Sequence, residues 1–324
     1  MNVRIVTPAP ARTRKGNRVT ALRWARLLKG LGAAVAIDTQ YRGEPADLLV
    51  ALHARRSFPA AARFRRERPA GRLVVALTGT DLYDDLPRSA EAHHALELAD
   101  RLVVLQPLGV NALPPWARDK ARPIFQSARP PDSPIQPPAG VFGAALVAHL
   151  REVKDPFLAP KALRLLPSSS RVELWHLGAA LDLGSAAMAL KEIQANARYH
   201  WLGERSRQET LRRVAGARLL VLTSRLEGGA NAVSEAIACG TPVLSTRIDG
   251  SVGMLGPDYP GYFPVGDAPA LARLLTRAES DAAFHASLRA GVERVRPLYA
   301  PERERAGWAA LLAELGLGGD VRGR

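Results

Sequence analysis

The proline-rich segment at residues 127–140 constrains the fold more than any other part of the sequence. It reads SARPPDSPIQPPAG and holds five prolines between Pro130 and Pro138. Because proline supplies no N–H donor to a strand ladder and breaks helices, this segment is predicted to be an extended connector. The chain has 324 residues, which is enough for a domain on either side. The sequence therefore predicts a first domain over 1–130, a linker over 131–140 and a second domain over 141–300.

Short apolar runs alternate with helical stretches on both sides of this connector. Such alternation is typical of parallel strands joined by helices, so each half is predicted to be a doubly wound, Rossmann-like α/β domain. Two open sheets of this kind bind a ligand at the carboxyl ends of their strands, in the cleft where the domains face each other. The predicted strands are 3–7, 33–39, 47–52, 73–78 and 101–105, then 143–149, 171–176, 199–202, 219–223 and 243–245.

Two helices are marked clearly in the sequence. Asn17 is expected to cap a helix whose apolar residues between Trp24 and Leu31 follow the i, i+3, i+4, i+7 spacing, and Gly30 and Gly32 are expected to end it. Near the other end of the sequence, Trp308 and three leucines share one face of a helix predicted over 301–316. The sequence leaves open whether this last helix packs back on the first domain.

The chain is strongly basic, with a formal net charge of +14 from 39 arginines and six lysines. It has no long Lys/Arg block, no zinc-finger spacing and no aromatic RNA-binding run, so a nucleic-acid partner is not expected. Aromatic residues make up only 6% of the chain, which also argues against a stacking platform for single strands. The arginine excess is either a compositional bias or a means of attracting a small anionic substrate.

A single cysteine, Cys239, excludes an internal disulfide and a Cys-rich metal site. No apolar run reaches the roughly 18 residues that a membrane helix needs. We therefore expect a cytoplasmic protein without a membrane partner.

The strongest motif lies at residues 219–245, which read LLVLTSRLEGGANAVSEAIACGTPVLS. A buried strand is followed by a loop with Glu227, then by a short helix with Glu235. The small residues Gly228, Gly229, Ala230 and Asn231 let backbone amides approach an anion at the start of this helix. A carboxylate one turn further in can accept two hydrogen bonds from sugar hydroxyls. The alternative is a capped helix with solvent-facing glutamates.

This string resembles the E-x7-E signature of retaining-type glycosyltransferases of the GT-B fold, the group-4 family. The resemblance implies that Glu235 holds the nucleotide ribose and that Glu227 lies beside the donor sugar. It also implies that the amides of Gly228 to Asn231 lie near the diphosphate or the sugar. Cys239 takes the place of a small residue before Gly-Thr-Pro, and we expect it to pack in the core without a redox role.

The segment HLREVKDP, which follows the first strand of the second half, matches a second part of such enzymes. There the resemblance implies that Arg151 and Lys154 face the donor diphosphate. Two cations at that point would neutralise the charge that grows on the leaving group. The alternative is a pair of solvated charges at a helix start. The chain has no Asp-x-Asp sequence, so no metal and no other cofactor is expected.

Three segments of the first half, TRKGNRVTALRW, DLLVALHARRS and LTGTDLY, resemble a narrower group. It is the selenosugar synthases of selenoneine biosynthesis, and the resemblance extends over residues 3–264. It implies a UDP-sugar of the glucose or N-acetylglucosamine type as donor, selenophosphate as acceptor and a 1-selenosugar as product.

These segments each follow a predicted strand, so they should face the ligand cleft with groups suited to an anion. His53 could orient or protonate the acceptor, or could simply be a strand-end histidine bonded to backbone. The expected catalytic residues are thus His53, Arg151, Lys154 and Glu227. The expected acceptor-binding residues are Lys15, Gly16, Asn17, Arg18, Arg55, Arg56, Thr78, Thr80 and Asp81.

Two other functions remain open from the sequence. One is a glycosyltransferase of the same fold with a hydroxyl or thiol acceptor. The other is a GT-B epimerase or a nucleotide-sugar binder without catalysis. Release of UDP with and without selenophosphate distinguishes these possibilities.

Overall fold

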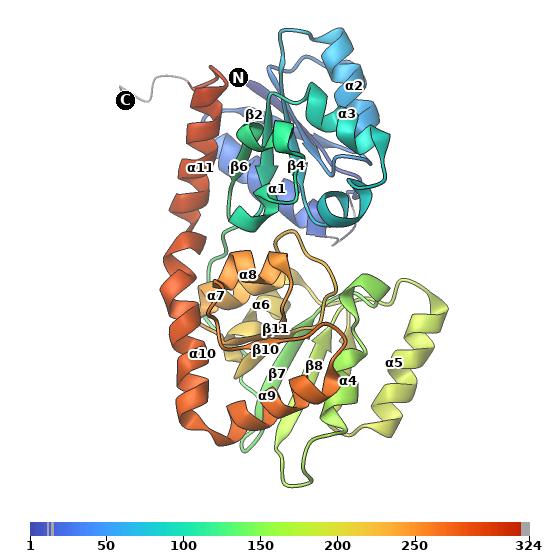
Figure 1. The fold of residues 1–324 in the computed structure, drawn as a ribbon, viewed down its shortest axis with the longest axis vertical. Coiled ribbons are helices and arrows are strands. Elements are labelled where there is room, and N and C mark those ends of the chain that lie inside the picture. Colours follow the sequence, from blue (N-terminus) through green and yellow to red (C-terminus); the bar gives the residue numbers. More distant parts are fainter. Residues whose placement is uncertain (12, 14–15, 319–324) are drawn as a thin grey trace. The chain divides into compact units, whose positions relative to one another are not determined.

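The computed structural model describes residues 1–11, 13 and 16–318, and the chain divides into two compact units (Figure 1). The first unit combines Met1–Gln126 with Pro301–Arg324, and the second is Ser127–Ala300. The proline-rich segment contains no helix or strand and belongs to the second unit. It is held there by two hydrogen bonds: Ile135 N–H donates to the Arg212 carbonyl at 2.8 Å, and the Arg212 guanidinium donates to the Ser133 carbonyl at 2.7 Å.

The first unit is built on a six-stranded parallel sheet in the order β2-β1-β3-β4-β5-β6. Helices connect the strands, as the alternating sequence pattern predicts. The strands are β1 Asn2–Val6, β2 Ala34–Asp38, β3 Leu48–Leu52, β4 Arg72–Leu77, β5 Arg101–Val104 and β6 Ala121–Pro123. The helices are α1 Gly16–Gly30, α2 Phe58–Glu67, α3 Ala90–Leu98 and α11 Pro301–Glu314, together with a π-helical turn, η1, at Asp81–Asp85.

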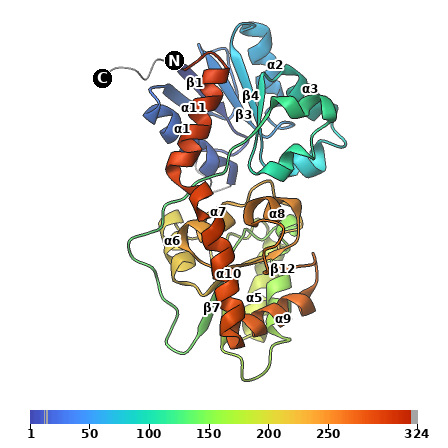
Figure 2. The same ribbon diagram turned by 60° about the vertical axis from the view of Figure 1, so that its left-hand side comes forward.

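The last helix, α11, packs against α1 within this unit (Figure 2). The rings of Trp24 and Trp308 meet edge to face with centroids 4.9 Å apart. The buried carboxylate of Glu304 accepts hydrogen bonds from the Trp24 indole at 2.8 Å and the Arg23 guanidinium at 3.1 Å. A buried charge is tolerated only when it is paired in this way, so these contacts fix α11 against α1. Helix α1 begins at Gly16, so Asn17 lies in its first turn and does not cap it, contrary to our expectation.

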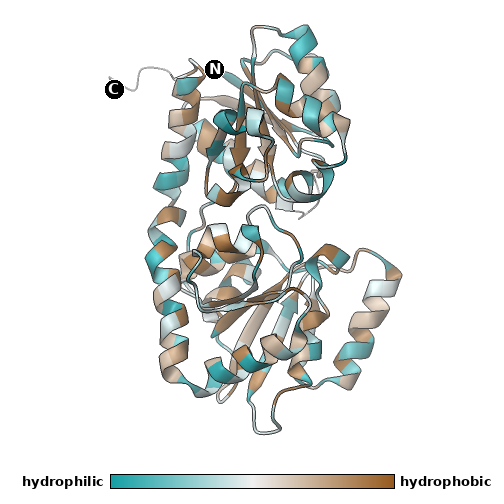
Figure 3. Cartoon of the chain, viewed as in Figure 1, coloured by the Kyte–Doolittle hydropathy of each residue, from teal (hydrophilic) through white to brown (hydrophobic). Residues whose placement is uncertain are grey.

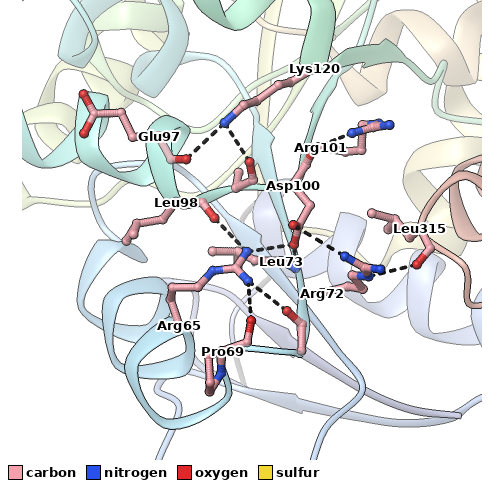
Figure 4. Close-up of polar contacts among 12 residues, drawn as sticks. Arg65, Pro69, Arg72, Leu73, Glu97, Leu98, Asp100, Arg101, Lys120 and Leu315 are labelled. Carbon is pink, nitrogen blue, oxygen red and sulfur yellow. Dashed lines mark hydrogen bonds and ion pairs between the residues drawn. The ribbon is translucent and has the colours of Figure 1, made fainter.

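Much of the positive charge at the amino edge of this sheet has a structural use (Figure 4). Lys120 donates to the carbonyls of Leu96, Glu97 and Ala99 near the end of α3, at 2.9 to 3.2 Å. Arg65 binds the Asp100 carboxylate at 2.7 Å. Cations near a helix carboxyl end satisfy carbonyls that have no partner inside the helix. These two residues therefore serve the fold and not an anionic ligand.

The second unit repeats the architecture with a six-stranded parallel sheet in the order β12-β11-β10-β7-β8-β9. Its strands are β7 Phe142–Val147, β8 Val172–Leu177, β9 Tyr199–Gly203, β10 Leu219–Leu222, β11 Val243–Thr246 and β12 Tyr262–Phe263. Its helices are α4 Leu158–Leu163, α5 Leu183–Ala195, α6 Arg207–Gly216, α7 Asn231–Cys239, α8 Asp249–Leu255, α9 Ala268–Ser280 and α10 Ala282–Val295.

The central strands of both sheets are apolar, except for the exposed Arg72 at the start of β4 (Figure 3). Strands buried on both faces read as continuous apolar runs, which explains why the sequence predicts them well. The predicted class, two doubly wound parallel α/β domains, is confirmed. In the second sheet the chain moves from β7 to β8 and β9, then returns to place β10 on the other side of β7. The carboxyl ends of β7 and β10 therefore flank the point where a doubly wound sheet binds its ligand.

Candidate active site

The loops that follow β7 and β10 are bonded to each other at this switch point. The Lys154 ammonium forms an ion pair with the Glu227 carboxylate. The Thr223 hydroxyl donates to the Lys154 carbonyl at 2.8 Å, and Arg225 N–H donates to the Val153 carbonyl at 2.8 Å. Two motifs that lie more than 70 residues apart in the sequence thus form one site. We call the site made by residues 148–157, 223–230 and helix α7 the β7–β10 edge.

The carboxylate of Glu227 is held from several sides and is only 8% exposed. The Ser224 hydroxyl donates to its Oε1 at 2.6 Å, and the Thr246 hydroxyl donates to the Ser224 carbonyl at 2.6 Å. Gly250, at the start of α8, lies so close that a Cβ there would be 2.0 Å from the Glu227 carbonyl oxygen. Sequence reasoning missed Ser224, Thr246 and Gly250, because only the packing of α8 shows their use.

The small residues before α7 form a buried loop in front of a helix start. Gly228, Gly229 and Ala230 are all buried. Among the hydrogen bonds within the described part of the chain, none is donated by the N–H groups of these three residues. Amides at a helix amino end favour a negative charge, since the helix dipole adds to the N–H groups. The arrangement can therefore receive an anion, as the motif predicts.

Glu235 is also buried, at 7% exposure, and faces the amino end of α6. Its Oε1 lies 3.2 Å from the Arg207 guanidinium. The alternative of solvent-facing glutamates is therefore wrong for both Glu227 and Glu235. Arg207 was not expected from the sequence, where nothing distinguishes it from the other arginines of the chain.

The two cations after β7 differ in their surroundings. Lys154 is committed to Glu227, whereas the side chain of Arg151 is exposed. No ion pair of Arg151 occurs within the described residues. The expectation that both cations face the donor diphosphate stays a prediction, and the structure adds that Lys154 has Glu227 as its counter-ion. Arg151 is therefore the exposed cation of the β7–β10 edge that no ion pair within the described residues neutralises.

A buried histidine, His176, forms a hydrogen bond with the loop that follows β7. The His176 Nε2–H donates to the Ala148 carbonyl at 2.9 Å, and its Nδ1 accepts from the Tyr199 hydroxyl at 2.7 Å. Burial lowers the pKa of His176 to about 4, so the ring is neutral near pH 7. Gly178 allows this approach, since a Cβ there would lie 1.7 Å from the Ala148 carbonyl oxygen.

Cys239, at the end of α7, has the properties of a packing residue. Burial raises the pKa of its thiol to about 12, and Glu235 adds to this effect. The thiolate that redox or nucleophilic chemistry needs is therefore absent near neutral pH.

In the first unit, the Asp81 side chain forms hydrogen bonds with the backbone that follows both β3 and β4. Its carboxylate is fully buried and accepts three backbone N–H groups, from Ala54 at 3.0 Å, Thr78 at 2.8 Å and Gly79 at 2.9 Å. This geometry contradicts the expectation that Asp81 binds the acceptor, because its carboxylate accepts hydrogen bonds from the backbone instead. The Thr78 hydroxyl also points inward, at 3.4 Å from Asp81 Oδ1.

His53 directly follows β3 and is 2% exposed. Its φ of 77° is unusual for a residue with a side chain, and such strain is retained where the surroundings enforce it. Nδ1 accepts from the Arg56 N–H at 3.3 Å, and Nε2 lies 3.3 Å from Thr80 Oγ1. The ring also lies 3.6 Å from the Asp85 carboxylate. Both nitrogens are thus engaged, which argues against a proton transfer role for His53 and favours a role in orientation.

The expected acceptor cations are placed unequally. Arg55 pairs with Asp85 at 2.9 Å, while Arg56 is exposed. Arg18 is half-buried in the first turn of α1, and its Nε has no hydrogen-bond partner in the described chain. Gly16 and Asn17 lie in the same turn, whereas Lys15 lies outside the described residues. Since α1 follows β1 and β1 pairs with β3, these groups belong to one carboxyl edge of the sheet.

Residues 140–294 match the family model described as Glycosyl transferases group 1. This segment, slightly less than half of the chain, is thus similar to that family. It contains the whole β7–β10 edge, so the residues discussed there lie in the matched segment. No match was found among curated proteins.

The complete fold is similar to several solved glycosyltransferases. HepE of Anabaena, solved with UDP and glucose, has a TM-score of 0.78 and 15% identity over 97% of this chain and 100% of that chain. Sucrose-phosphate synthase of Thermosynechococcus elongatus has a TM-score of 0.79 and 17% identity over 98% and 100%. A glycosyltransferase of Rickettsia africae has a TM-score of 0.72 and 14% identity over 98% and 99%. At these identities the likeness concerns the fold, which is the GT-B fold predicted.

Two further findings concern metal ligands and membrane-spanning helices. Within the described residues, no three His, Cys, Asp or Glu side chains gather as metal ligands would. No helix in the described ranges is long and apolar enough to cross a bilayer.

Proposed function

We propose that this chain transfers a sugar from a UDP-sugar to selenophosphate and releases UDP. The donor half of the proposal rests on the β7–β10 edge, which lies in the segment similar to group 1 glycosyltransferases. A protein of similar fold, HepE of Anabaena, has been solved with UDP-glucose. A UDP-sugar of the glucose or N-acetylglucosamine type is accordingly the proposed donor.

The acceptor half rests on one observation, the contacts that already engage the acidic and imidazole groups after β3 and β4 in the first sheet. On the described loops after β3 and β4, Asp81 is bonded to backbone amides and His53 uses both ring nitrogens. Asp85 faces Arg55 and His53, and Asp84 pairs with Arg88. A hydroxyl acceptor would have to give its proton to one of these groups or to the departing diphosphate. An anionic nucleophile needs neither.

The remaining groups at that edge favour an anion. Arg18 and Arg56 have no counter-ion in the described chain, and the first turn of α1 presents its backbone N–H groups at Gly16 and Asn17. Such groups bind phosphoryl oxygens through charge-assisted hydrogen bonds. Selenophosphate offers both the oxyanion that these groups recognise and a soft selenium nucleophile that requires little activation.

In the proposed reaction, selenium attacks the anomeric carbon while the bond from that carbon to the UDP oxygen breaks. Negative charge grows on the diphosphate, and Arg151 together with the amides of Gly228 to Ala230 would stabilise it. Glu235 would bind the ribose hydroxyls of the donor, held in place by Arg207. Water then cleaves the selenium–phosphorus bond, which gives phosphate and the 1-selenosugar.

In this proposal Lys154 and Glu227 act as a pair. The cation would hold the buried carboxylate in place beside the sugar, and the carboxylate would keep Lys154 directed at the site. Removing one partner would leave the other charge buried and unpaired, which is costly.

The test is UDP release from UDP-glucose and UDP-N-acetylglucosamine, measured with selenophosphate, with a neutral thiol, with an alcohol and with no acceptor. The proposal requires release that depends on selenophosphate. Faster turnover of the thiol or alcohol would show that the proposed acceptor is wrong, while the proposed glycosyltransferase activity would stand. No release with any acceptor would leave a nucleotide-sugar binder or an epimerase.

A further inference from the structure

The proton on the His53 imidazole has a defined position. Because Nδ1 accepts the Arg56 backbone N–H, the neutral ring must carry its hydrogen on Nε2. Burial lowers the pKa of His53 below its ordinary value, against the opposing effect of Asp81 and Asp85, so the neutral ring prevails at pH 7. The Nε2–H group then points toward Thr80 Oγ1 at 3.3 Å and Asp85 Oδ2 at 3.6 Å.

This proton position decides what the Thr80 hydroxyl can do. Since Thr80 Oγ1 accepts from His53, its own hydrogen remains for another acceptor. Within the described residues this hydroxyl makes no further hydrogen bond. The Thr78 hydroxyl, by contrast, is turned toward Asp81. Of the two threonines on this turn, only Thr80 is set to donate away from the protein.

Asp85 connects the imidazole to the neighbouring guanidinium. Its Oδ1 lies 2.9 Å from Arg55 Nε and its Oδ2 lies 3.6 Å from His53 Nε2, and both contacts are electrostatic, without hydrogen-bond geometry. Because the ion pair uses Nε, the two terminal nitrogens of Arg55 are not engaged by it. A guanidinium held in this way can present both terminal N–H groups to one oxyanion. Asp85 lies at the end of the π-helical turn η1, and such turns are frequent at functional sites.

We propose that Thr80 and Arg55 bind the oxyanion of the acceptor, and that His53 and Asp85 are positioning residues that set the direction of these hydrogen bonds. This inference rests on the proposed function and specifies its acceptor site. The groups proposed to contact the ligand, the Thr80 hydroxyl and the Arg55 guanidinium, then present hydrogen-bond donors, so the site favours ligands that accept hydrogen bonds.

The test uses inorganic phosphate as the probe, with its affinity measured by calorimetry on the full chain saturated with UDP. Thr80→Val keeps the shape of the side chain and should lower the affinity for phosphate about 10–150-fold, which is the effect of losing one hydrogen bond to a charged group. Thr80→Ser restores the hydroxyl and should recover binding to within about 3-fold of wild type. UDP affinity, measured in parallel, should stay unchanged in both variants.

The positioning role of His53 has its own signature. Asparagine tolerates the positive φ of this position, so His53→Asn should keep the turn while removing the Nε2–H donor. If His53 acts through Thr80, the two substitutions combined should weaken phosphate no more than Thr80→Val alone. Additive losses would mean that His53 acts independently of Thr80 and would overturn this part.

Asp85→Asn is compared with Asp84→Asn, a neighbour on η1 whose carboxylate pairs with the exposed Arg88. The first change should weaken phosphate about 10-fold or more, because Arg55 loses its support, and the second should leave affinity unchanged. If Asp85→Asn binds phosphate more tightly, the Asp85 carboxylate merely repels the anion, and the proposal is overturned. Wild-type phosphate affinity in Thr80→Val would also overturn it.

These results are separable from the proposed function. If the variants behave as expected but selenophosphate is not turned over, the anion site stands and the assigned acceptor is wrong. If selenophosphate is turned over but Thr80→Val leaves both the acceptor KM and phosphate affinity unchanged, the function stands and this inference fails.

Discussion

The sharpest prediction concerns Gly250, which the structure places against the backbone of Glu227. A Cβ at residue 250 would lie 2.0 Å from the Glu227 carbonyl oxygen and 2.8 Å from its carbonyl carbon. Non-bonded heavy atoms prefer separations of about 3.5–4.0 Å, so Gly250→Ala must displace Glu227 by more than about 1 Å. Both contacts are with backbone, so no side-chain rotation can relieve them.

The displacement should affect catalysis more than folding. Overpacking of this kind costs about 1–3 kcal/mol of stability, which a domain of this size can survive. A shift of about 1 Å in a positioning group can lower the rate about 100-fold. We therefore expect Gly250→Ala to remain folded, with a lower Tm, and to lose about 100-fold in kcat/KM for the UDP-sugar.

The assay is steady-state UDP release, with Tm measured on the same preparations. Gly30→Ala is the control, because a Cβ at that helix end meets nothing within 4 Å. It should leave both kcat/KM and Tm close to wild type. The reasoning is refuted if Gly250→Ala lowers Tm as expected while kcat/KM stays within about 3-fold of wild type.

Three further predictions follow from the same geometry. Glu235→Ala should weaken UDP and UDP-sugar alike by about 10–150-fold in calorimetry, since the proposed ribose contact is common to both, and unchanged affinity in a folded variant would remove Glu235 from the site. Arg151→Met should lower kcat more than it raises the donor KM, because the charge that it stabilises grows in the transition state; a pure KM effect would make it a ground-state clamp. The unfolding free energy should fall by roughly 3 kcal/mol as the pH drops from 6.5 toward 4, because unfolded His176 takes up a proton that the buried ring, with its pKa lowered to about 4, refuses. This slope should be smaller in His176→Gln, followed by denaturant titration at each pH.

The fold could be predicted largely from the sequence, because central strands of parallel sheets are buried on both faces. The run from Leu48 to Leu52 is entirely buried and entirely apolar, so its pattern is unambiguous. The edge strands β6 and β12 were missed. They are two or three residues long, and Ala121–Pro123 contains an arginine and a proline that carry no strand signal.

The site was only partly predictable, for a physical reason. Motif spacing identifies Glu227 and Lys154, but no local pattern indicates that the two side chains form an ion pair. Gly250 and Arg207 depend on how α8 and α6 pack, which is long-range information. Asp81 was assigned to the wrong role because a carboxylate that binds substrate and one that binds backbone amides look the same in a sequence.

Arginine residues illustrate the same limit. Arg65 and Arg18 are indistinguishable in the sequence, yet Arg65 donates hydrogen bonds to backbone carbonyls and pairs with Asp100. Arg18 lies at the first turn of α1 with its Nε unpartnered in the described chain. The excess positive charge therefore has at least two uses, and only the contacts separate them.

The central claim is that the sugar is transferred to an anionic acceptor that needs no catalytic base from the protein. Competition kinetics test this claim most directly. UDP release is measured against selenophosphate concentration at several fixed concentrations of inorganic phosphate, and then with the UDP-sugar as the varied substrate. The account predicts competitive inhibition by phosphate toward selenophosphate, with no competition toward the UDP-sugar. Phosphate that fails to compete with selenophosphate, together with faster UDP release on a neutral alcohol or thiol, would contradict it.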